Sequence, residues 1–577
     1  MKKIYALLLL VFAISNYACG QSKTDKLDAL ISAYAKEGQF NGSVLVTEKG
    51  EIIYKKGFGL ANMEWEIPNQ PDTKFRLASV TKQFTAMLIV QLVSENKLKL
   101  DVPISTYLPD YPKKNGDIIT IHQLLTHTSG IPNYTSFPGY RNMMSTTYRP
   151  EEIVRLFADS TLDFTPGERF QYSNSGYVLL GYIIEQLTGK SYEQVLQEKI
   201  FTPLKMMNSG YDHNETVIKN RAAGYNQVGN TFQNANYIDM SVPFSAGGIY
   251  STVEDLYLWD QALYSEKLLP KKYLDLIFTK HIPAGQNYYG YGWQIGKMPV
   301  GNSEDQVETI SHSGSINGFG TLITRIPSDK SLIVLLNNTG GTPLYDMTIA
   351  ITGILYGKSY SPPKKSMAYS LLKAIEKEDI NTALLFYKKN KDSGDYVLSE
   401  NEMNLAGYQL LQSGKTKEAA SVFKLNVEAY PNSFNTYDSY GEALLVLGDS
   451  TQAIENYKKS VKLNPGNENG VKILKALGVN TDTLIKNVAI EDLKLLEGEY
   501  LVTNPATDGD KYWKIEFEVV NGELFGNDRG YRYKLVPLGN NQFINPDDGE
   551  SLVFDTKDKK AITLTLFGRF KFKKMTR

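Results

Sequence analysis

Apolar residues after residue 80 recur three and four positions apart, which is the spacing of one face of an α-helix. A polar turn at residues 71–74 precedes them. The series consists of Phe84, Met87, Leu88 and Leu92. We therefore predict one amphipathic helix that begins near residue 79 and buries this face.

Residues 367–477 are helical in pattern, and two segments within them repeat at a spacing of 34. The matching pairs are Gly407 and Gly441, Leu410 and Leu444, Ala419 and Ala453, Phe423 and Tyr457, and Pro431 and Pro465. Paired antiparallel helices explain this pattern, because small residues allow close approach and a proline ends each unit. The region resembles the tetratricopeptide repeat, with a degenerate first unit around residues 369–387. It predicts either a groove for a protein or peptide partner or a spacer packed on the rest of the chain.

The last part of the chain, from about residue 493, alternates between apolar and polar positions as β-strands do. Residues 513–519 alternate in this way, and Asn521-Gly522 is a strong two-residue hairpin signal directly after them. Residues 562–566 and 570–572 continue the alternation. We predict a small antiparallel β-barrel or sandwich, and we interpret it as an accessory domain without chemistry of its own.

The length of 577 residues indicates several domains, because single cores rarely grow beyond about 250–300 residues. The predicted boundaries are a leader at 1–20 and domains at 23–358, 366–480 and 490–577. With 42% hydrophobic residues and a net charge of −1, the composition indicates neither disorder nor a nucleic-acid partner.

The first twenty residues have the pattern of an export signal. Lys2 and Lys3 form a basic start, and residues 4–14 are an apolar run too short to span a bilayer of about 30 Å. Cys19, the only cysteine, stands where this segment ends, so the site resembles a bacterial lipoprotein cleavage site with Cys19 as the lipid-bearing residue. Ordinary cleavage near Gly20, which would release a periplasmic or secreted protein, is the alternative. In either case no thiol remains for a disulfide, and a lipid anchor would be the only membrane contact.

Ser79 and Lys82 are three positions apart, so both project from the same face of a helix that begins near Ser79. In the first helical turn, unpaired backbone amides and the helix dipole stabilise a developing alkoxide. A buried lysine loses part of its preference for the charged form and can act as a base. The pair is the minimal layout of a serine acyl-transfer enzyme, although a serine cap with a solvated lysine has the same spacing.

Two further segments add polar groups of the right kind. Tyr172-Ser173-Asn174 supplies a phenol that can shuttle a proton and an amide that can orient Lys82 or a substrate carbonyl. His312-Ser313-Gly314 precedes residues 321–324, which alternate as a strand does. The small residues Gly314 and Ser315 would let a substrate lie along the edge of that strand.

Together these motifs resemble those of the serine β-lactamases and penicillin-binding proteins, in particular the class C β-lactamase, D,D-peptidase and esterase-like branch. Flanking segments at residues 75–79, 124–130, 172–177 and 245–252 are similar to the same group. The resemblance covers about residues 26–357 and implies an α/β domain with an antiparallel sheet flanked by helices. The predicted fold class is therefore multidomain, with this α/β domain, an all-α helical-repeat domain and a small all-β domain.

The resemblance also implies roles for individual residues. Ser79 would be the acylated nucleophile, Lys82 its proton acceptor and Tyr172 the shared general base. Asn174 would position Lys82 and the substrate amide. The backbone amides of Ser79 and Ser315 would form the oxyanion hole, in which the loss of one donor typically costs two to three orders of magnitude in rate.

His312 departs from the pattern of many antibiotic-hydrolysing relatives, which carry at this position a lysine that holds a substrate carboxylate. A histidine with an ordinary pKa of about 6.5 is only partly charged near neutrality, so the departure favours esters or peptides over β-lactams. We interpret His127 as a loop histidine with a structural hydrogen bond and Glu168 as a solvated turn residue. His122 and His127 lack a carboxylate at zinc spacing, so neither a metal nor another cofactor is expected.

These features predict an exported serine hydrolase, as a periplasmic protein or membrane-anchored lipoprotein of a bacterium. It would act on a small peptide, amide or ester through a Ser79 acyl-enzyme. Two alternatives stay open: a penicillin-binding or sensor-type protein that acylates but turns over poorly, and an inert scaffold that carries the repeats. The presence of Ser79, Lys82 and Tyr172 together argues against the scaffold.

Overall fold

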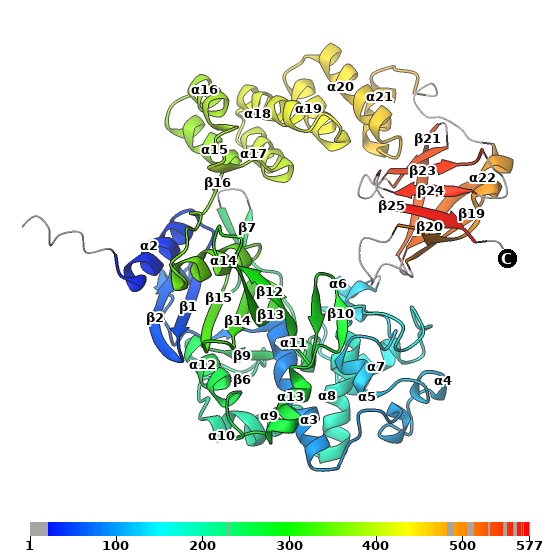
Figure 1. Ribbon diagram of the computed structural model, residues 1–577. Helices are drawn as coiled ribbons and strands as arrows, with labels where there is room; N and C mark the ends of the chain where they lie inside the picture. Colours follow the sequence, from blue (N-terminus) through cyan, green and yellow to red (C-terminus); the bar gives the residue numbers. More distant parts are fainter. Residues whose placement is uncertain are drawn as a thin grey trace, which may run out of the picture.

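The computed structural model describes residues 21–575 except 138, 229–230, 482–488, 505–512, 529–530, 540, 546–550, 558–561, 567 and 569. Within them the chain forms a sheet domain flanked by helices, a series of helical hairpins and a β-barrel (Figure 1). The predicted fold class is confirmed. The export segment and Cys19 lie outside the described residues. No helix in the described part is long and apolar enough to cross a membrane.

The sheet domain is built on an eight-stranded antiparallel sheet with the order β10-β11-β12-β13-β14-β15-β1-β2. Its strands are β1 (Gly42–Glu48), β2 (Glu51–Phe58), β10 (Ile282–Ala284), β11 (Asn287–Tyr289), β12 (Gln294–Pro299), β13 (Gln306–Ile316), β14 (Phe319–Ile326) and β15 (Ser331–Asn337). Strand β1 is apolar on both sides: Val44 and Val46 belong to one core and Leu45 to another. A strand of this kind needs a covering layer on each face.

Helices supply both layers. Helices α2 (Lys23–Lys36) and α14 (Leu344–Leu355) cover one face of the sheet. The larger core on the other face is formed with α3 (Thr81–Ser94), α5 (Ile121–Leu125), α7 (Pro150–Ala158), α8 (Asn174–Thr188), α9 (Tyr192–Leu196), α11 (Phe244–Gly247), α12 (Val253–Ala262) and α13 (Lys271–Ile277). Short strands complete this domain: β3 (Leu60–Asn62), β4 (Ile67–Pro68), β5 (Phe75–Arg76), β6 (Gly210–Tyr211), β7 (Tyr225–Val228), β8 (Thr231–Asn234) and β9 (Ile249–Ser251).

Helix α3 begins at Thr81, directly after a short 3-10 turn, η1 (Ala78–Val80), so helical structure begins near Ser79 as predicted. Every residue from Thr81 to Leu92 is buried, so the predicted single buried face is wrong. The polar side chains between the apolar ones are buried because α8, α11 and α13 pack against this helix, and its apolar residues share one core with residues of the sheet.

The helical hairpins are α15 (Met367–Lys377) with α16 (Ile380–Asn390), α17 (Glu400–Gln412) with α18 (Thr416–Ala429), and α19 (Phe434–Val446) with α20 (Ser450–Leu463), followed by α21 (Glu468–Ala476). Equivalent glycines explain the 34-residue period. A Cβ at Gly407 would lie 2.5 Å from the Phe423 ring, and one at Gly441 would lie 2.9 Å from the Tyr457 ring. The predicted close approach of paired helices is therefore confirmed at these positions.

The last part is a closed barrel preceded by α22 (Ile490–Leu496). Its strands are β18 (Gly498–Val502), β19 (Lys514–Val520), β20 (Glu523–Asp528), β21 (Tyr531–Gly539), β22 (Gln542–Ile544), β23 (Ser551–Asp555), β24 (Thr563–Leu566) and β25 (Phe570–Lys574). Asn521 and Gly522 both have positive φ angles, 53° and 81°, as a tight type I′ hairpin turn requires. Of the two predicted architectures, barrel or sandwich, the chain adopts the barrel.

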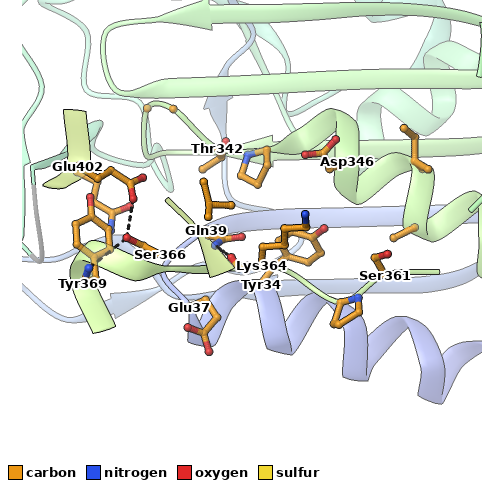
Figure 2. Close-up of a pocket in the computed structure, with 18 of the residues that line it drawn as sticks. Tyr34, Glu37, Gln39, Thr342, Asp346, Ser361, Lys364, Ser366, Tyr369 and Glu402 are labelled. Atoms are coloured by element: carbon orange, nitrogen blue, oxygen red, sulfur yellow. Dashed lines mark hydrogen bonds between the residues drawn. The ribbon is translucent and has the colours of Figure 1, made fainter. Parts of the chain in front are cut away.

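A cavity of about 740 Å³ lies between the sheet domain and the first hairpins (Figure 2). Four acidic or basic side chains lie in its wall: Glu37, Asp346, Lys364 and Glu402. The Ser366 hydroxyl donates to Glu402 at 2.6 Å. This cavity, which we call the interdomain cavity, thus has acidic and basic side chains in its wall.

Candidate active site

Ser79 is presented by a strained segment that two strands hold in place. Ala78, the residue before it, has a φ of +50°, a left-handed conformation that is costly for a residue with a side chain. The Leu77 amide donates to the Ile249 carbonyl at 2.8 Å, and the Thr321 hydroxyl donates to the Leu77 carbonyl at 2.9 Å. Half-buried Ser79 therefore stands directly before the first turn of α3.

Lys82 is fully buried, and its amine is hydrogen-bonded to three oxygens. Its Nζ donates to Ser79 Oγ at 3.1 Å, to Asn174 Oδ1 at 2.8 Å and to the Ala246 carbonyl at 2.9 Å. Burial lowers its pKa well below the ordinary 10.5, because an ammonium loses its hydration there and none of these three acceptors is a carboxylate. The neutral amine is accordingly accessible in a pH range where an exposed lysine is charged.

Tyr172 completes the group around Ser79. Burial raises the pKa of its phenol, and a hydrogen bond to Ser79 acts in the opposite direction. The Lys82 Nζ lies 4.9 Å from the centre of the Tyr172 ring. The structure thus brings Ser79, Lys82 and Tyr172 together from two parts of the chain almost a hundred residues apart.

His127 holds the backbone on both sides of Tyr172. Its carbonyl accepts from the Gln171 amide at 2.9 Å, and its Nδ1 accepts from the Ser173 amide at 3.1 Å. Its ring lies 4.3 Å from the Tyr172 ring, centre to centre. Burial, Lys82 and His312 lower its pKa well below 6.5, so the ring is neutral and accepts through Nδ1. The interpretation of His127 as a structural loop histidine agrees with these contacts, but its direct hold on Tyr172 was not predicted.

Asn174 is the first residue of α8, where the helix begins beside the site. Its Oδ1 accepts from Lys82, and its Nδ2 donates to Thr135 Oγ1 at 3.3 Å. Its backbone amide donates to Asn133 Oδ1 at 3.0 Å. These hydrogen bonds hold the Asn174 side chain with its Oδ1 toward Lys82, as expected for a residue that positions this lysine.

Gly314 on β13 has a packing role that the sequence did not indicate. A Cβ there would lie 2.2 Å from the Leu77 carbonyl oxygen and 2.5 Å from Thr321 Oγ1. The glycine therefore lets the segment that carries Ser79 lie directly on β13. Ser315, the next residue, is exposed and lies in the wall of the cavity at Ser79.

His312 lies on β13 and is buried beneath the site. Its Nδ1 donates to the Ser313 carbonyl at 2.7 Å, so its Nε2 accepts from the Tyr289 hydroxyl at 2.9 Å. Burial, together with Lys82, lowers its pKa to about 3. His312 is therefore a neutral ring near pH 7, and the expected partial charge at this position is absent.

The low pKa of His312 predicts a specific loss of stability in acid. The unfolded chain binds a proton at His312 below about pH 6.5, whereas the folded domain does not until about pH 3, so stability falls as the pH is lowered. Between pH 7 and 5 this residue should cost about 2 kcal/mol. Between pH 7 and 5, the free energy of unfolding of His312→Gln should therefore fall by less than that of wild type, and the difference should equal this amount. Urea unfolding at both pH values measures it. Equal losses in wild type and His312→Gln would contradict the assignment of this acid sensitivity to His312. The control is His213→Gln, which removes a histidine at the surface.

A cavity of about 410 Å³ opens at Ser79, and we call it the Ser79 cavity. Ala78, Asn174, Ala246, Gly247 and Ser315 line it together with Ser79. The Ala246 carbonyl was not predicted as a partner of Lys82. The signal for it was present, since residues 245–252 carry part of the family resemblance, but a backbone acceptor is not recognisable from residue type.

Two other polar residues near the site are occupied elsewhere. His122 Nδ1 is hydrogen-bonded to the Tyr291 hydroxyl at 2.8 Å. Glu168 is exposed and accepts from the Thr165 amide at 3.2 Å, as the interpretation of a turn residue requires. Within the described part of the chain, no group of three or more His, Cys, Asp or Glu side chains is arranged to hold a metal ion.

Comparison with known proteins identifies the family of the sheet domain. The sequence profile of the family Beta-lactamase matches residues 27–352, more than half of the chain. The chain belongs to the beta-lactamase family. The match contains all three motifs and the segments that enclose Lys82.

Relatives within the beta-lactamase family include proteins of several activities. A penicillin-binding protein of Bacillus subtilis (strain 168) is 30% identical over 71% of this chain and 94% of its own length. A teichoic acid D-alanine hydrolase of Staphylococcus aureus (strain MRSA252) is 30% identical over 54% of this chain and 73% of its own length. The solved structure of a D-amino acid amidase from Ochrobactrum anthropi SV3 matches with a TM-score of 0.50 and 26% identity, over 57% of this chain and 99% of that chain. The sheet domain is therefore a beta-lactamase-fold hydrolase related to penicillin-binding proteins and D-amino-acyl hydrolases.

Proposed function

We propose that this protein is an exported serine hydrolase that acts on a peptide, amide or ester through an acyl-enzyme on Ser79. The observation that carries the proposal is the Lys82 amine, which is fully buried, 3.1 Å from Ser79 Oγ, and lowered in pKa. A serine beside an amine that is easily deprotonated is an activated nucleophile. The basic and apolar pattern of residues 1–20 supports export.

In the proposed reaction, Ser79 Oγ attacks the substrate carbonyl while its proton passes to the Lys82 amine. Because the pKa of Tyr172 is raised, its phenol is neutral near pH 7, and it relays the proton between Ser79, Lys82 and the leaving group. The leaving amine or alcohol departs with that proton and leaves an ester on Ser79. Water then attacks the ester and gives a proton to the same groups, the bond between the carbonyl carbon and Ser79 Oγ breaks, and the proton passes to Ser79 Oγ as the acid is released.

The developing oxyanion would be held by the backbone amides of Ser79 and Ser315, both of which lie in the wall of the Ser79 cavity. Asn174 would keep Lys82 aimed at Ser79 and turn its Nδ2 toward the substrate. The D-amino acid amidase and the teichoic acid D-alanine hydrolase among the relatives support an acyl group derived from a D-amino acid. β-Lactams rank last among the candidate substrates, because His312 is neutral.

A protein that acylates but turns over poorly is the second candidate. Glu168, an acidic residue shortly before Tyr172 in the chain, is exposed and bonded within its own turn, which favours slow deacylation. The lifetime of the acyl adduct on Ser79 distinguishes the two candidate functions. A hydrolase loses this adduct within its turnover time, whereas a sensor-type protein retains the adduct.

The proposal is tested by the intact mass of the full chain after treatment with a fluorophosphonate. We expect one adduct on wild type and on Ser145→Ala, and none on Ser79→Ala. Ser145 is a suitable control because it is an exposed serine close to Tyr140, which lines the Ser79 cavity. An adduct that persists in Ser79→Ala would refute the assignment of the nucleophile.

A further inference from the structure

The Ser79 cavity has a wall without formal charge. Among the described residues that line it, none is Asp, Glu, Lys, Arg or His. Its polar groups are amides and hydroxyls, contributed by Asn174, Asn226, Asn317, Thr135, Tyr140 and Ser315. Such groups bind carbonyls and hydroxyls well, but they do not neutralise an ion.

Ionisable side chains outside this wall are hydrogen-bonded to partners of their own. Lys82 donates to Ser79, Asn174 and the Ala246 carbonyl, and burial lowers its pKa as it lowers that of His312. Arg76 donates to Asp212 at 2.7 Å. The Asp239 carboxylate accepts from the hydroxyls of Ser241 at 2.6 Å and Thr147 at 2.7 Å. None of these side chains lines the Ser79 cavity.

The interdomain cavity shows that this neutrality is local. Gly340 lies in the wall of both cavities, and the wall of the interdomain cavity also contains Glu37, Asp346, Lys364 and Glu402 (Figure 2). Two neighbouring residues of strand β7 mark the boundary: Asn226 faces the Ser79 cavity, and Gln227 faces the interdomain cavity. Charged side chains are therefore close by in the fold but are kept out of the reactive site.

We propose that the hydrolase selects substrates that carry no charge next to the reactive bond. The preferred acyl group is an N-acylated amino acid or a simple acyl chain, and the leaving group lacks an adjacent carboxylate. This inference rests on the proposed Ser79 hydrolase activity and specifies its substrate class. A free carboxylate or ammonium would lose part of its hydration in the cavity without an opposite charge to replace it. Peptides that end in a free carboxylate beside the scissile bond are accordingly poor substrates.

Three esters that share one D-alanyl group test the selection on the full chain. The neutral ester joins N-acetyl-D-alanine to N-methylglycolamide; the anionic one joins N-acetyl-D-alanine to glycolate; the cationic one joins D-alanine with a free amine to N-methylglycolamide. We expect kcat/KM for the neutral ester to exceed the other two by at least about tenfold. Hydrolysis is measured by chromatography of the products, with Ser79→Ala as the background.

The outcomes separate this inference from the proposed function. Ser79-dependent hydrolysis that is equal for the three esters, or faster for a charged one, overturns the neutral-substrate inference and leaves the hydrolase intact. Absence of Ser79-dependent hydrolysis of all three overturns the proposed function and the inference together.

A new cation in the wall should change the selection in a predictable direction. Asn226→Lys should raise the ratio of anionic to neutral kcat/KM about tenfold or more, because it places an ammonium in the Ser79 cavity. Gln227→Lys adds the same charge one residue away, in the interdomain cavity, and should leave the ratio unchanged. An equal change of this ratio in both variants would contradict the role of the neutral wall. So would an unchanged ratio in an Asn226→Lys enzyme that still hydrolyses the neutral ester.

Discussion

Replacing Lys82 by methionine should lower kcat/KM by about three orders of magnitude, within the range of a general base. Methionine has a similar length and no amine, so Ser79 would keep its position but lose its proton acceptor. Lys97→Met is the matched control, because Lys97 is an exposed lysine just after α3 that pairs with Glu95 at 2.8 Å. The measurement is steady-state hydrolysis of a neutral ester at pH 7.

The pH dependence of the wild-type enzyme supplies a second check on Lys82. The amine accepts a proton only when it is neutral, so kcat/KM should rise with pH as Lys82 loses its proton. Because burial lowers its pKa well below 10.5, this rise should be complete well below that pH. A rise centred near 10.5, or a Lys82→Met enzyme within tenfold of wild type, would show that another group is the base.

Tyr172→Phe should reduce the rate of acylation about a hundredfold. The substitution removes the hydroxyl that is hydrogen-bonded to Ser79 and keeps the ring that lies beside His127 and Lys82. The rate of fluorophosphonate labelling in a stopped time course measures the nucleophilic attack by Ser79 that acylation also requires.

Tyr177→Phe is the matched control for Tyr172. The Tyr177 ring also lies near the Lys82 amine, at 5.5 Å, but its hydroxyl donates to the Leu125 carbonyl at 2.9 Å rather than to Ser79. We expect a modest loss of stability and little change in labelling rate. Equal rates for Tyr172→Phe and wild type would remove Tyr172 from the proton path and leave Lys82 as the sole base.

Local patterns in the sequence determined much of the architecture. The 34-residue spacing predicted the paired helices, and the glycines at 407 and 441 have the packing role that their repetition indicated. Asn521-Gly522 predicted a hairpin, because few residues other than Asn and Gly adopt positive φ at both positions of the turn. These signals are readable because turn geometry and helix pairing within a hairpin depend on residues close together in the chain.

The motifs at Ser79, Tyr172 and His312 also pointed to one site before any contact was known. Their chemistry was informative because a hydroxyl, an amine and a phenol in one chain suggest acyl transfer, and their order resembles a family. Their spacing could not give the protonation states. Burial lowers the pKa of Lys82, His127 and His312, and burial is a property of the assembled domain.

Only the tertiary structure decided what encloses the site. It buries α3 on all sides, and it packs Leu77 directly against Gly314 of β13. It also hydrogen-bonds His127 to the backbone on both sides of Tyr172. It also closes the last strands into a barrel and lines the Ser79 cavity, among the described residues, with side chains that carry no charge. Each of these results comes from contacts between segments far apart in the chain, which leave no period or spacing in the sequence. The sequence therefore determined which groups are available for chemistry. The packing of distant segments determined the pKa values of these groups, the direction in which their side chains point and the surface that a substrate contacts.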